Sequence, residues 1–171
     1  MSQSIASLGT NGKEPDLRNR PEQTLPEKLS VRTLTETEIP SALDLAWRAF
    51  LAFEGPEYSA EGIDEFRKSI RDPEYLSGLR FYGAFAGTLL AGVAATRTSG
   101  THIALLFVDG NHHRQGIGKA LFLALAEDCS SRPLTVNSSP YAVGFYRSLG
   151  FRETAAEQNV RGLRFTPMAF Q

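Results

Sequence analysis

The stretch from His102 to Phe122 restricts the fold of this chain more than any other part of its sequence. It begins with a seven-residue apolar run, HIALLFV, continues through a loop with two glycines, and ends in apolar residues at helical spacing. The apolar run is too short for a helix, so it predicts a central strand. The sequence therefore predicts a strand, a loop and a helix in direct succession.

Gly116 and Gly118 stand where the loop meets the predicted helix. Glycine at such a place either relieves backbone strain or lets another group approach the main chain closely. The first backbone N–H groups of the helix point at one place, and the positive end of the helix dipole lies there, so the loop is suited to phosphate. Close packing of the helix on the strand would require the same two glycines. The spacing alone leaves both interpretations open.

Two common nucleotide-binding motifs do not fit this loop. The Walker A motif requires Ser or Thr after Gly-Lys, but Gly118-Lys119 is followed by Ala120, which offers no hydroxyl to a magnesium ion. The dinucleotide-binding fingerprint requires a third glycine, and Leu121 occupies that position. The sequence therefore argues against both classes.

The elements on either side of this unit indicate a mixed α/β domain. Helices are predicted from Ile39, after an N-cap at Ser59, after Gly116, and after an N-cap at Ser139. Antiparallel hairpins are mixed with helical crossovers, so we expect a mixed, mostly antiparallel sheet of about six or seven strands with about four helices on its faces. The strands are predicted at 30–34, 80–86, 88–98, 102–108, 134–137, 151–156 and 164–170.

Residues 1–29 differ in composition from the rest of the chain. They are rich in Ser, Gly, Pro, Asn and charged residues and contain no aromatic residue. Such a segment buries too little apolar surface to offset the entropy of ordering, so we expect a flexible N-terminal tail. The pattern predicts a single domain from 30 to 171.

Charge and composition restrict the partners of this chain. A net charge of −1 gives no field that favours nucleic acid or an anionic membrane, so we expect neither as a partner. Cys129 is the only cysteine, which excludes internal disulfides and multi-thiolate metal sites. The three histidines lack zinc-binding spacing, so no metal is expected. The sequence shows no membrane-length apolar run and no signal-peptide pattern, which makes a cytoplasmic protein the default expectation.

Two motifs, in the expected order, resemble the GNAT N-acetyltransferases. LLFVDGNHHRQGIGKALF resembles the acetyl-CoA signature of that family, Gln/Arg-x-x-Gly-x-Gly/Ala after a strand, with Gly116 and Gly118 in register and His113 in place of Gln or Arg. SSPYAVGFYRSLGF resembles the family's late helix, Asn-x-x-Ala-x-x-Phe-Tyr followed by Leu-Gly-Phe, with Ser139 in place of Asn. The resemblance covers about Val31 to Gln171.

The resemblance implies the GNAT fold, in which the two central strands, here 102–108 and 134–137, splay apart around the co-substrate acetyl-CoA. It implies that backbone amides of the glycine loop hold the diphosphate and that the backbone of Phe107 and Val108 pairs with the pantetheine arm. The Val108 N–H would face the thioester carbonyl as an oxyanion donor. The coenzyme-binding residues implied are Phe107, Val108, His113, Arg114, Gln115, Gly116, Ile117, Gly118, Lys119, Ser139 and Tyr146.

The resemblance also implies catalytic roles. Tyr146 occupies the place of the family's general acid, which protonates the departing thiolate. His102 stands where the histone-acetylating members have a glutamate base, and neutral imidazole can accept a proton near pH 7; a strand-end histidine bonded to its surroundings is the alternative. Glu54 and Glu57 lie in the loop that commonly lines the acceptor pocket in this family. Either could be an alternative base or could attract a cationic amine. Tyr58 is a weaker candidate for the same pocket.

These observations predict an N-acetyltransferase that moves an acetyl group from acetyl-CoA to a primary amine of a small molecule or amino-acid derivative. The amine would attack directly in a ternary complex, without a metal. Two alternatives stay open, a non-catalytic acyl-CoA-binding sensor and an interaction module that uses the same fold. Because members of the family often dimerise, we expect a monomer or a homodimer.

Overall fold

The apolar strand predicted at 102–108 lies in the middle of the sheet. The computed structural model describes residues 28–97, 100–129 and 131–171 of the chain. The predicted tail falls outside these ranges up to residue 27, and Leu29 already belongs to the first strand. The strands are β1 (Leu29–Thr33), β2 (Leu79–Ala86), β3 (Leu89–Arg97), β4 (His102–Val108), β5 (Leu134–Ser138), β6 (Arg152–Glu153), β7 (Gln158–Val160) and β8 (Leu163–Phe170).

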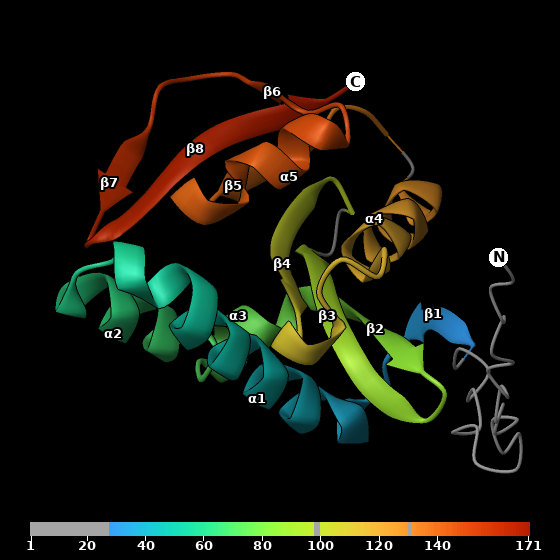
Figure 1. Ribbon diagram of the computed structural model, residues 1–171. Helices are drawn as coiled ribbons and strands as arrows, with labels where there is room; N and C mark the ends of the chain where they lie inside the picture. The colour runs from blue at the N-terminus through green and yellow to red at the C-terminus, as the bar shows by residue number, and fades with distance from the viewer. Residues whose placement is uncertain (1–27, 98–99, 130) are drawn as a thin grey trace, which may run out of the picture.

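The strands follow the order β1-β2-β3-β4-β5-β8-β6, and β7 pairs with β8 (Figure 1). In the described part of the chain β4 and β5 are parallel and the other neighbouring pairs are antiparallel. This confirms the predicted mixed, mostly antiparallel sheet. The C-terminal end differs in detail, since β6 is much shorter than the predicted strand 151–156. All three residues of β7 are exposed, so no apolar alternation could have predicted that strand.

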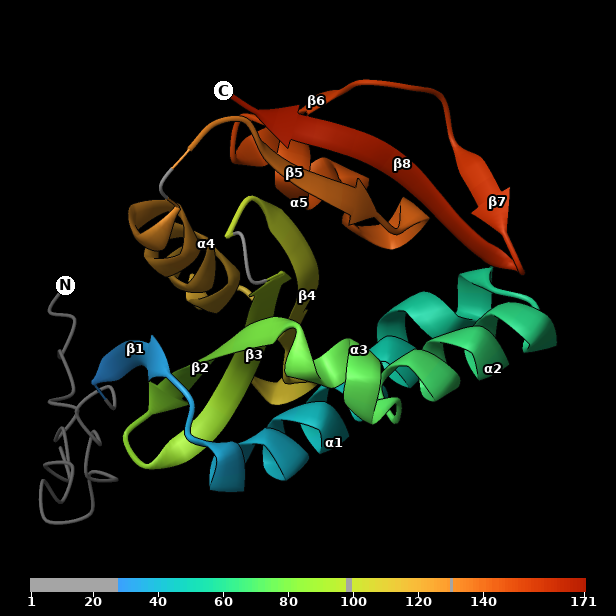
Figure 2. The same cartoon turned by 180° about the vertical axis from the view of Figure 1, so that it is seen from behind.

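The two central strands separate soon after they meet. β4 and β5 pair only through His102 with Thr135 and Ile103 with Val136. Beyond that point β4 continues beside β3, whereas β5 continues beside β8. Figure 2 shows the two strands diverging from this junction. The predicted splay of 102–108 and 134–137 is therefore present in the sheet.

Helices cover both faces of the sheet. The helix α4 and the helix α5 pack on one face around Leu121, Tyr146 and Met168, while α1 and α2 pack on the other around Phe50, Val93 and Leu105. This confirms the predicted arrangement. The α-helices are α1 (Ile39–Ala49), α2 (Ala60–Ser69), α3 (Pro73–Ser77), α4 (Ile117–Asp128) and α5 (Val143–Ser148).

Two helix starts differ from the prediction. No helix was predicted in the stretch RDPEYLSG, but it forms α3, because the Asp72 side chain accepts a hydrogen bond from the Glu74 N–H and Pro73 fits the first helical position. Ser139 precedes a 3₁₀ turn, Pro140–Ala142, without a side-chain capping bond, and α5 begins only at Val143. Ser59 does cap α2, since its hydroxyl oxygen accepts from the Gly62 N–H at 3.2 Å.

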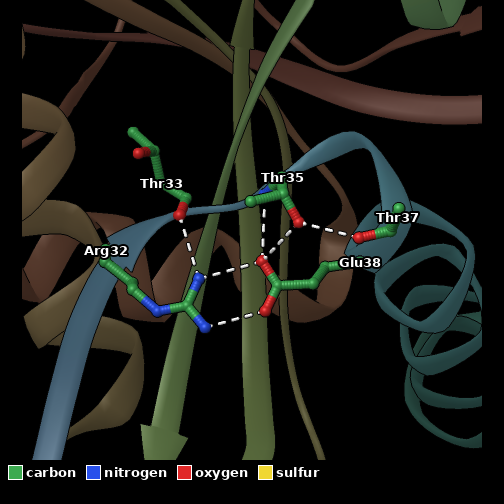
Figure 3. Close-up of polar contacts among 5 residues, drawn as sticks. All are labelled: Arg32, Thr33, Thr35, Thr37 and Glu38. Carbon is green, nitrogen blue, oxygen red and sulfur yellow. Dashed lines mark hydrogen bonds and ion pairs between the residues drawn. The ribbon is translucent and has the colours of Figure 1, made fainter.

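A network of hydrogen bonds fixes the turn between β1 and α1 (Figure 3). The Arg32 guanidinium donates to both carboxylate oxygens of Glu38, at 2.9 and 2.7 Å. The same carboxylate accepts from the Thr35 N–H at 2.9 Å and from its hydroxyl at 3.0 Å. These bonds, first among them those from Arg32, lower the pKa of Glu38 from 4.5 to about 2. The N-terminal strand is therefore tied to the first helix by an ionised carboxylate.

Replacing Glu38 by Gln should destabilise the protein slightly at pH 7 and less at pH 3. A carboxyl whose pKa is lowered by folding stabilises the fold above its ordinary pKa, and that contribution is lost as pH falls from 4.5 toward 2. The urea midpoints of the wild type and Glu38→Gln at the two pH values measure this difference. Glu36→Gln, in the same turn, is the control, and an equal loss at both pH values in Glu38→Gln would contradict the assignment.

In the described residues, no helix combines the length and the apolar character that crossing a lipid bilayer requires.

Candidate active site

Two cavities lie where β4 and β5 separate. The loop cavity, of about 550 Å³, is lined by the glycine loop at the start of α4 and by Phe53 and Tyr141. The hairpin cavity, of about 360 Å³, is lined by residues of α2 and of the β7–β8 hairpin. The two cavities are neighbours, because some residues line both. These shared residues are Glu54, Leu106, Phe107 and Ala142.

The glycine loop adopts the left-handed conformation twice before α4 begins. Arg114 has φ 60°, and Gly116, the N-cap of α4, has φ 77°. Such turns direct successive backbone N–H groups toward one side, which makes an anion-binding nest at the helix start. A Cβ on Gly116 would meet no atom within 4 Å, so the space beside the nest is open. At Gly118 it would lie 3.0 Å from Phe145 Cζ, so that glycine serves close packing.

His113 holds the glycine loop against the end of β4. Its Nε2 lies 3.0 Å from the Val108 carbonyl oxygen, which can only accept, so Nε2 carries a proton. The centroid of its ring lies 4.3 Å from that of Phe53. The His113 side chain therefore positions the loop and contributes to the wall of the loop cavity.

The side chains of the glycine loop suit an anionic ligand. Arg114 and Lys119 are exposed and line the loop cavity, and within the described residues neither forms an ion pair. Ile117 is buried at the cavity wall. Gln115, which was also expected to contact the coenzyme, lines neither cavity, and its amide points to the Asn111 carbonyl at 3.5 Å. The nest and two cations thus face the same space.

A β-bulge in β4 lines the hairpin cavity. Opposite β3, Leu105 pairs with Ala95 but Ile103 pairs with Thr96, so Ala104 is the extra residue. Bulges change which backbone groups of a strand face its two edges, and they are frequent next to active sites. This bulge directly follows the last residue through which β4 pairs with β5. It therefore coincides with the start of the splay.

Beyond the bulge, Leu106 and Val108 present backbone groups to the open edge of β4. The Asp109 N–H donates to a carbonyl of β3 at 2.9 Å. Because successive residues of a strand face alternate edges, Val108 and Leu106 face away from β3, whereas Phe107 faces it. His113 meets the Val108 carbonyl on this open edge. Val108 thus has the orientation expected of it, while Leu106 takes the place expected for Phe107, whose ring lines both cavities.

Glu54 reaches the junction of the two cavities from the end of the first helix. After Ala49, α1 continues as a π-helical turn, Phe50–Glu54, which the Gly55 N–H closes by donating to the Phe50 carbonyl. Pro56 has no N–H to donate, so the wide turn ends there and the chain passes into a 3₁₀ turn, Gly55–Glu57. Such wide turns inside helices are frequent at functional sites. Here the turn ends on a carboxylate that lines both cavities.

The surroundings of Glu54 tune its protonation. Burial raises the pKa of its carboxyl to about 7, the Ser139 hydroxyl opposes this rise, and the charge of Glu57 adds to it. Ser139 is buried, and its Oγ has no hydrogen bond of normal geometry among the described residues. A carboxyl with a pKa near neutrality can both accept and release a proton under physiological conditions. Ser139 lines the hairpin cavity rather than the loop cavity, where the coenzyme was expected.

Tyr146 lines the hairpin cavity from α5. It is 4% exposed and packs edge-on against Phe145 and Phe151. Burial, followed by the charge of Glu54, raises the pKa of its phenol above the ordinary value of 10. The hydroxyl therefore stays protonated at neutral pH and can serve as a donor in the same cavity as Glu54.

His102 lies at the opposite end of β4 from the glycine loop. Its Nδ1 is 2.8 Å from Thr135 Oγ1, where β4 pairs with β5. Burial, with the charge of Arg97 second, lowers the pKa of its imidazole to about 4, which makes it a weak base. His102 lines neither cavity. The structure thus favours the alternative reading, a strand-end histidine bonded to its neighbour.

Glu57 and Tyr58 follow Glu54 in the chain but differ in surroundings. Glu57 is exposed and lines neither cavity. Tyr58 lines the hairpin cavity, and its hydroxyl donates to the Arg164 carbonyl of β8 at 2.9 Å. Burial raises the pKa of this phenol, and the charge of Glu54 adds to the rise. The structure therefore brings Glu54, Tyr58 and Tyr146 together and leaves Glu57 outside.

Two glycines dock the β7–β8 hairpin on α2, a contact that was not predicted from the sequence. A Cβ on Gly62 would lie 2.3 Å from the Gly162 carbonyl oxygen, so the two main chains touch directly. Arg161, in the turn of the hairpin, forms an ion pair with Glu65 of α2 at 2.8 Å. Figure 1 shows the end of the hairpin at α2. Residues of the hairpin and of α2 line the hairpin cavity. No local sequence pattern could indicate that these two glycines touch, because they are far apart in the chain.

Across residues 28–97, 100–129 and 131–171, no group of three or more His, Cys, Asp or Glu side chains is placed to hold a metal ion.

Comparison with known proteins gives one family and many similar folds. A family profile described as "Acetyltransferase (GNAT) domain" matches residues 54–171. Curated protein sequences give no significant match. The structure is similar to a GCN5-related N-acetyltransferase from Rhodopseudomonas palustris, with a TM-score of 0.73 and 19% identity over 85% of this chain and 96% of that chain.

Two further solved structures share this fold. PaiA N-acetyltransferase from Thermoplasma acidophilum, solved in complex with coenzyme A, has a TM-score of 0.65 and 18% identity over 82% of this chain and 98% of that chain. The apo form of YjaB from Escherichia coli has a TM-score of 0.67 and 22% identity over 83% of this chain and 97% of that chain. At these identities the likeness shows the fold alone.

Proposed function

Because this chain belongs to the GNAT acetyltransferase family, we propose that it moves an acetyl group from acetyl-coenzyme A to a primary amine of a small molecule or amino-acid derivative. The amine attacks directly while both substrates are bound. The observation that carries this proposal is the meeting of two unlike cavities at Glu54 and Leu106. The loop cavity is suited to an anion, and the hairpin cavity is suited to a mostly apolar molecule.

The loop cavity fits the coenzyme. Its nest at Gly116 would hold the diphosphate, with Arg114 and Lys119 adding positive charge. The open edge of β4 would offer the backbone groups of Leu106 and Val108 to the amide-containing pantetheine arm. The complex of PaiA N-acetyltransferase with coenzyme A, which has the same fold, supports this use of the cavity.

The residues at the junction divide the chemistry between them. The coenzyme supplies an acetyl thioester, whose carbonyl carbon forms a bond to the amine nitrogen and whose carbon–sulfur bond breaks. Glu54 accepts the proton that an ammonium group must lose before its nitrogen can attack. The Val108 N–H donates to the carbonyl oxygen, and one such donor lowers a barrier by about 3 kcal/mol. Tyr146 gives its proton to the sulfur and regains one from the nitrogen, so protons balance.

Replacing Tyr146 by Phe should lower turnover without weakening coenzyme binding. The variant keeps the ring that packs against Phe145 and Phe151 and loses only the donor. We expect kcat to fall by about 100-fold, as for loss of a general acid. Steady-state kinetics and calorimetry with acetyl-CoA measure the two effects. Unchanged kcat would remove Tyr146 from the mechanism.

The function itself is tested by calorimetry with acetyl-CoA and by release of the coenzyme thiol in the presence of an amine panel. We expect saturable binding below about 1 mM and thiol release with at least one amine. Binding without thiol release for every amine would instead support the non-catalytic acyl-CoA sensor. A folded protein that does not bind acetyl-CoA at all would exclude the proposed transferase.

A further inference from the structure

The hairpin cavity has a lining rich in aromatic rings. The centroids of Phe50 and Phe66 lie 4.0 Å apart in a stacked arrangement, and those of Phe50 and Tyr58 lie 5.5 Å apart. Besides Tyr146, the rings that line the cavity belong to Phe50, Tyr58, Phe66, Tyr75, Phe107 and Phe165. Aromatic walls of this kind gain most from contact with a flat or bulky apolar group.

One charged group of the hairpin cavity has no oppositely charged partner in the described part of the chain. The charged residues that line the cavity there are Glu54, Glu65, Arg161 and Arg164. Glu65 pairs with Arg161 at 2.8 Å. Arg164 donates to both carboxylate oxygens of Glu157, at 2.9 and 3.2 Å. Only Glu54 is left to balance a charge on a ligand, so the cavity is suited to one cationic group.

The cavity is also small. Its volume of about 360 Å³ is near the lower end of the range for ligand pockets. On its α2 side the direct contact between Gly62 and Gly162 leaves no room for a chain to pass between the helix and the hairpin. A compact molecule fits this space better than an extended peptide.

From these three features we propose that the acceptor is a primary monoamine with a ring-sized apolar body. Its ammonium group lies at Glu54, at the junction with the loop cavity, and its apolar body lies among the rings of the hairpin cavity. A diamine or polyamine would carry a second cation into a lining that has no free carboxylate for it. This inference rests on the acetyl transfer proposed above.

A panel of three amines tests the inference. The probes are 2-phenylethylamine, 1,5-diaminopentane and a tripeptide with a free N-terminus, each assayed for thiol release from acetyl-CoA. We expect kcat/KM for 2-phenylethylamine to exceed that for the other two by about tenfold or more. Among the described residues, the cavity offers no partner for the second cation of the diamine, and it is too small for an extended peptide. Equal or better use of the diamine or the peptide would overturn the inference while leaving the transferase intact.

Binding measurements separate the inference from the proposed function. If no amine releases thiol, the proposed transferase fails, and the preference of the cavity is then read from calorimetric titration of the same three amines into the protein with coenzyme A present. Tighter binding of 2-phenylethylamine than of 1,5-diaminopentane would still support the assignment of the cavity. The opposite order would reject it.

A charge variant makes the test sharper. Arg161→Asn removes the partner of Glu65 and so creates a second free carboxylate in the cavity; asparagine tolerates the left-handed backbone of this position, φ 49°. We expect the ratio of kcat/KM for 1,5-diaminopentane to that for 2-phenylethylamine to rise about threefold, the size of effect expected of one exposed ion pair. Arg80→Asn, which removes an arginine paired with Asp128 away from both cavities, is the matched control. An unchanged ratio in Arg161→Asn would contradict the charge argument.

Discussion

Replacing Glu54 by Gln should lower kcat/KM by about 100-fold or more at pH 8, the effect expected when a general base is lost. Glutamine keeps the size of the side chain at the junction of the two cavities but cannot accept a proton. Because the pKa of Glu54 is raised to about 7, the activity of the wild type should increase as pH passes 7 and the carboxyl ionises. In the variant this increase should be absent, and the difference between the two proteins should shrink below pH 7.

Unfolding cannot explain such a loss, because the variant should be at least as stable as the wild type at pH 8. The folded state raises the pKa of Glu54 from its ordinary 4.5, so the wild type loses stability as pH rises from 4.5 through 7. Glutamine does not titrate and avoids this loss. Thermal unfolding at pH 5 and pH 8 measures it.

A substitution of the exposed neighbour Glu57 tests which of the two carboxylates of this loop acts in catalysis. Glu57→Gln should keep most of the wild-type activity, because Glu57 lines neither cavity. Since the charge of Glu57 contributes to the raised pKa of Glu54, its removal should shift the activity profile slightly to lower pH. A large loss in Glu57→Gln with little change in Glu54→Gln would reverse the assignment.

Gly116→Val should weaken acetyl-CoA binding by at least about tenfold, which corresponds to about 1.4 kcal/mol. Valine is strongly disfavoured at φ 77°, so the loop must either keep a strained conformation or abandon the nest. The left-handed conformation costs a side-chain-bearing residue about 1 to 2 kcal/mol, so some loss of folding stability is expected as well. Calorimetry with acetyl-CoA and urea unfolding measure the two effects separately.

Gly100→Val is the matched control for backbone strain. Gly100 precedes β4 with φ 70°, and among the described residues a Cβ there would meet its nearest atom only at 3.9 Å. The strain should therefore be similar, but Gly100 lines neither cavity. We expect both variants to lose comparable stability and only Gly116→Val to lose coenzyme affinity. Equal affinity in the two variants would show that the nest does not bind the coenzyme.

The central part of the fold follows from local patterns. The run at 102–108 became the central strand, and the residues after Gly116 became α4. Both signals are contained in a short stretch, where apolar spacing and glycine position decide the local structure. The helix α3 and the strand β7 were missed, since α3 depends on one side-chain cap at Asp72 and β7 on pairing with β8. Neither has a periodic apolar pattern of its own.

The parts of the candidate site that residues adjacent in sequence form could be predicted. The parts that residues far apart in sequence form were harder to predict. The nest at Gly116 follows from residues adjacent in sequence. The choice between His102 and Glu54 as the general base does not, because it depends on which of them lines the cavities of the folded chain. His102 contacts Thr135 where β4 and β5 are still paired. Glu54 lies close to Ser139, which follows β5. A bulge at Ala104, which no sequence pattern indicates, directs the backbone groups of Leu106 rather than those of Phe107 to the open edge of β4.

The short pairing between β4 and β5 has a consequence for how the protein responds to its ligands. Two register pairs join the four N-terminal strands to the C-terminal part of the sheet, and the cavities begin where this pairing stops. A ligand that contacts both parts of the sheet binds only while they are held together, so its binding free energy stabilises their association. Resistance to local opening at this seam should therefore increase with the concentration of such a ligand.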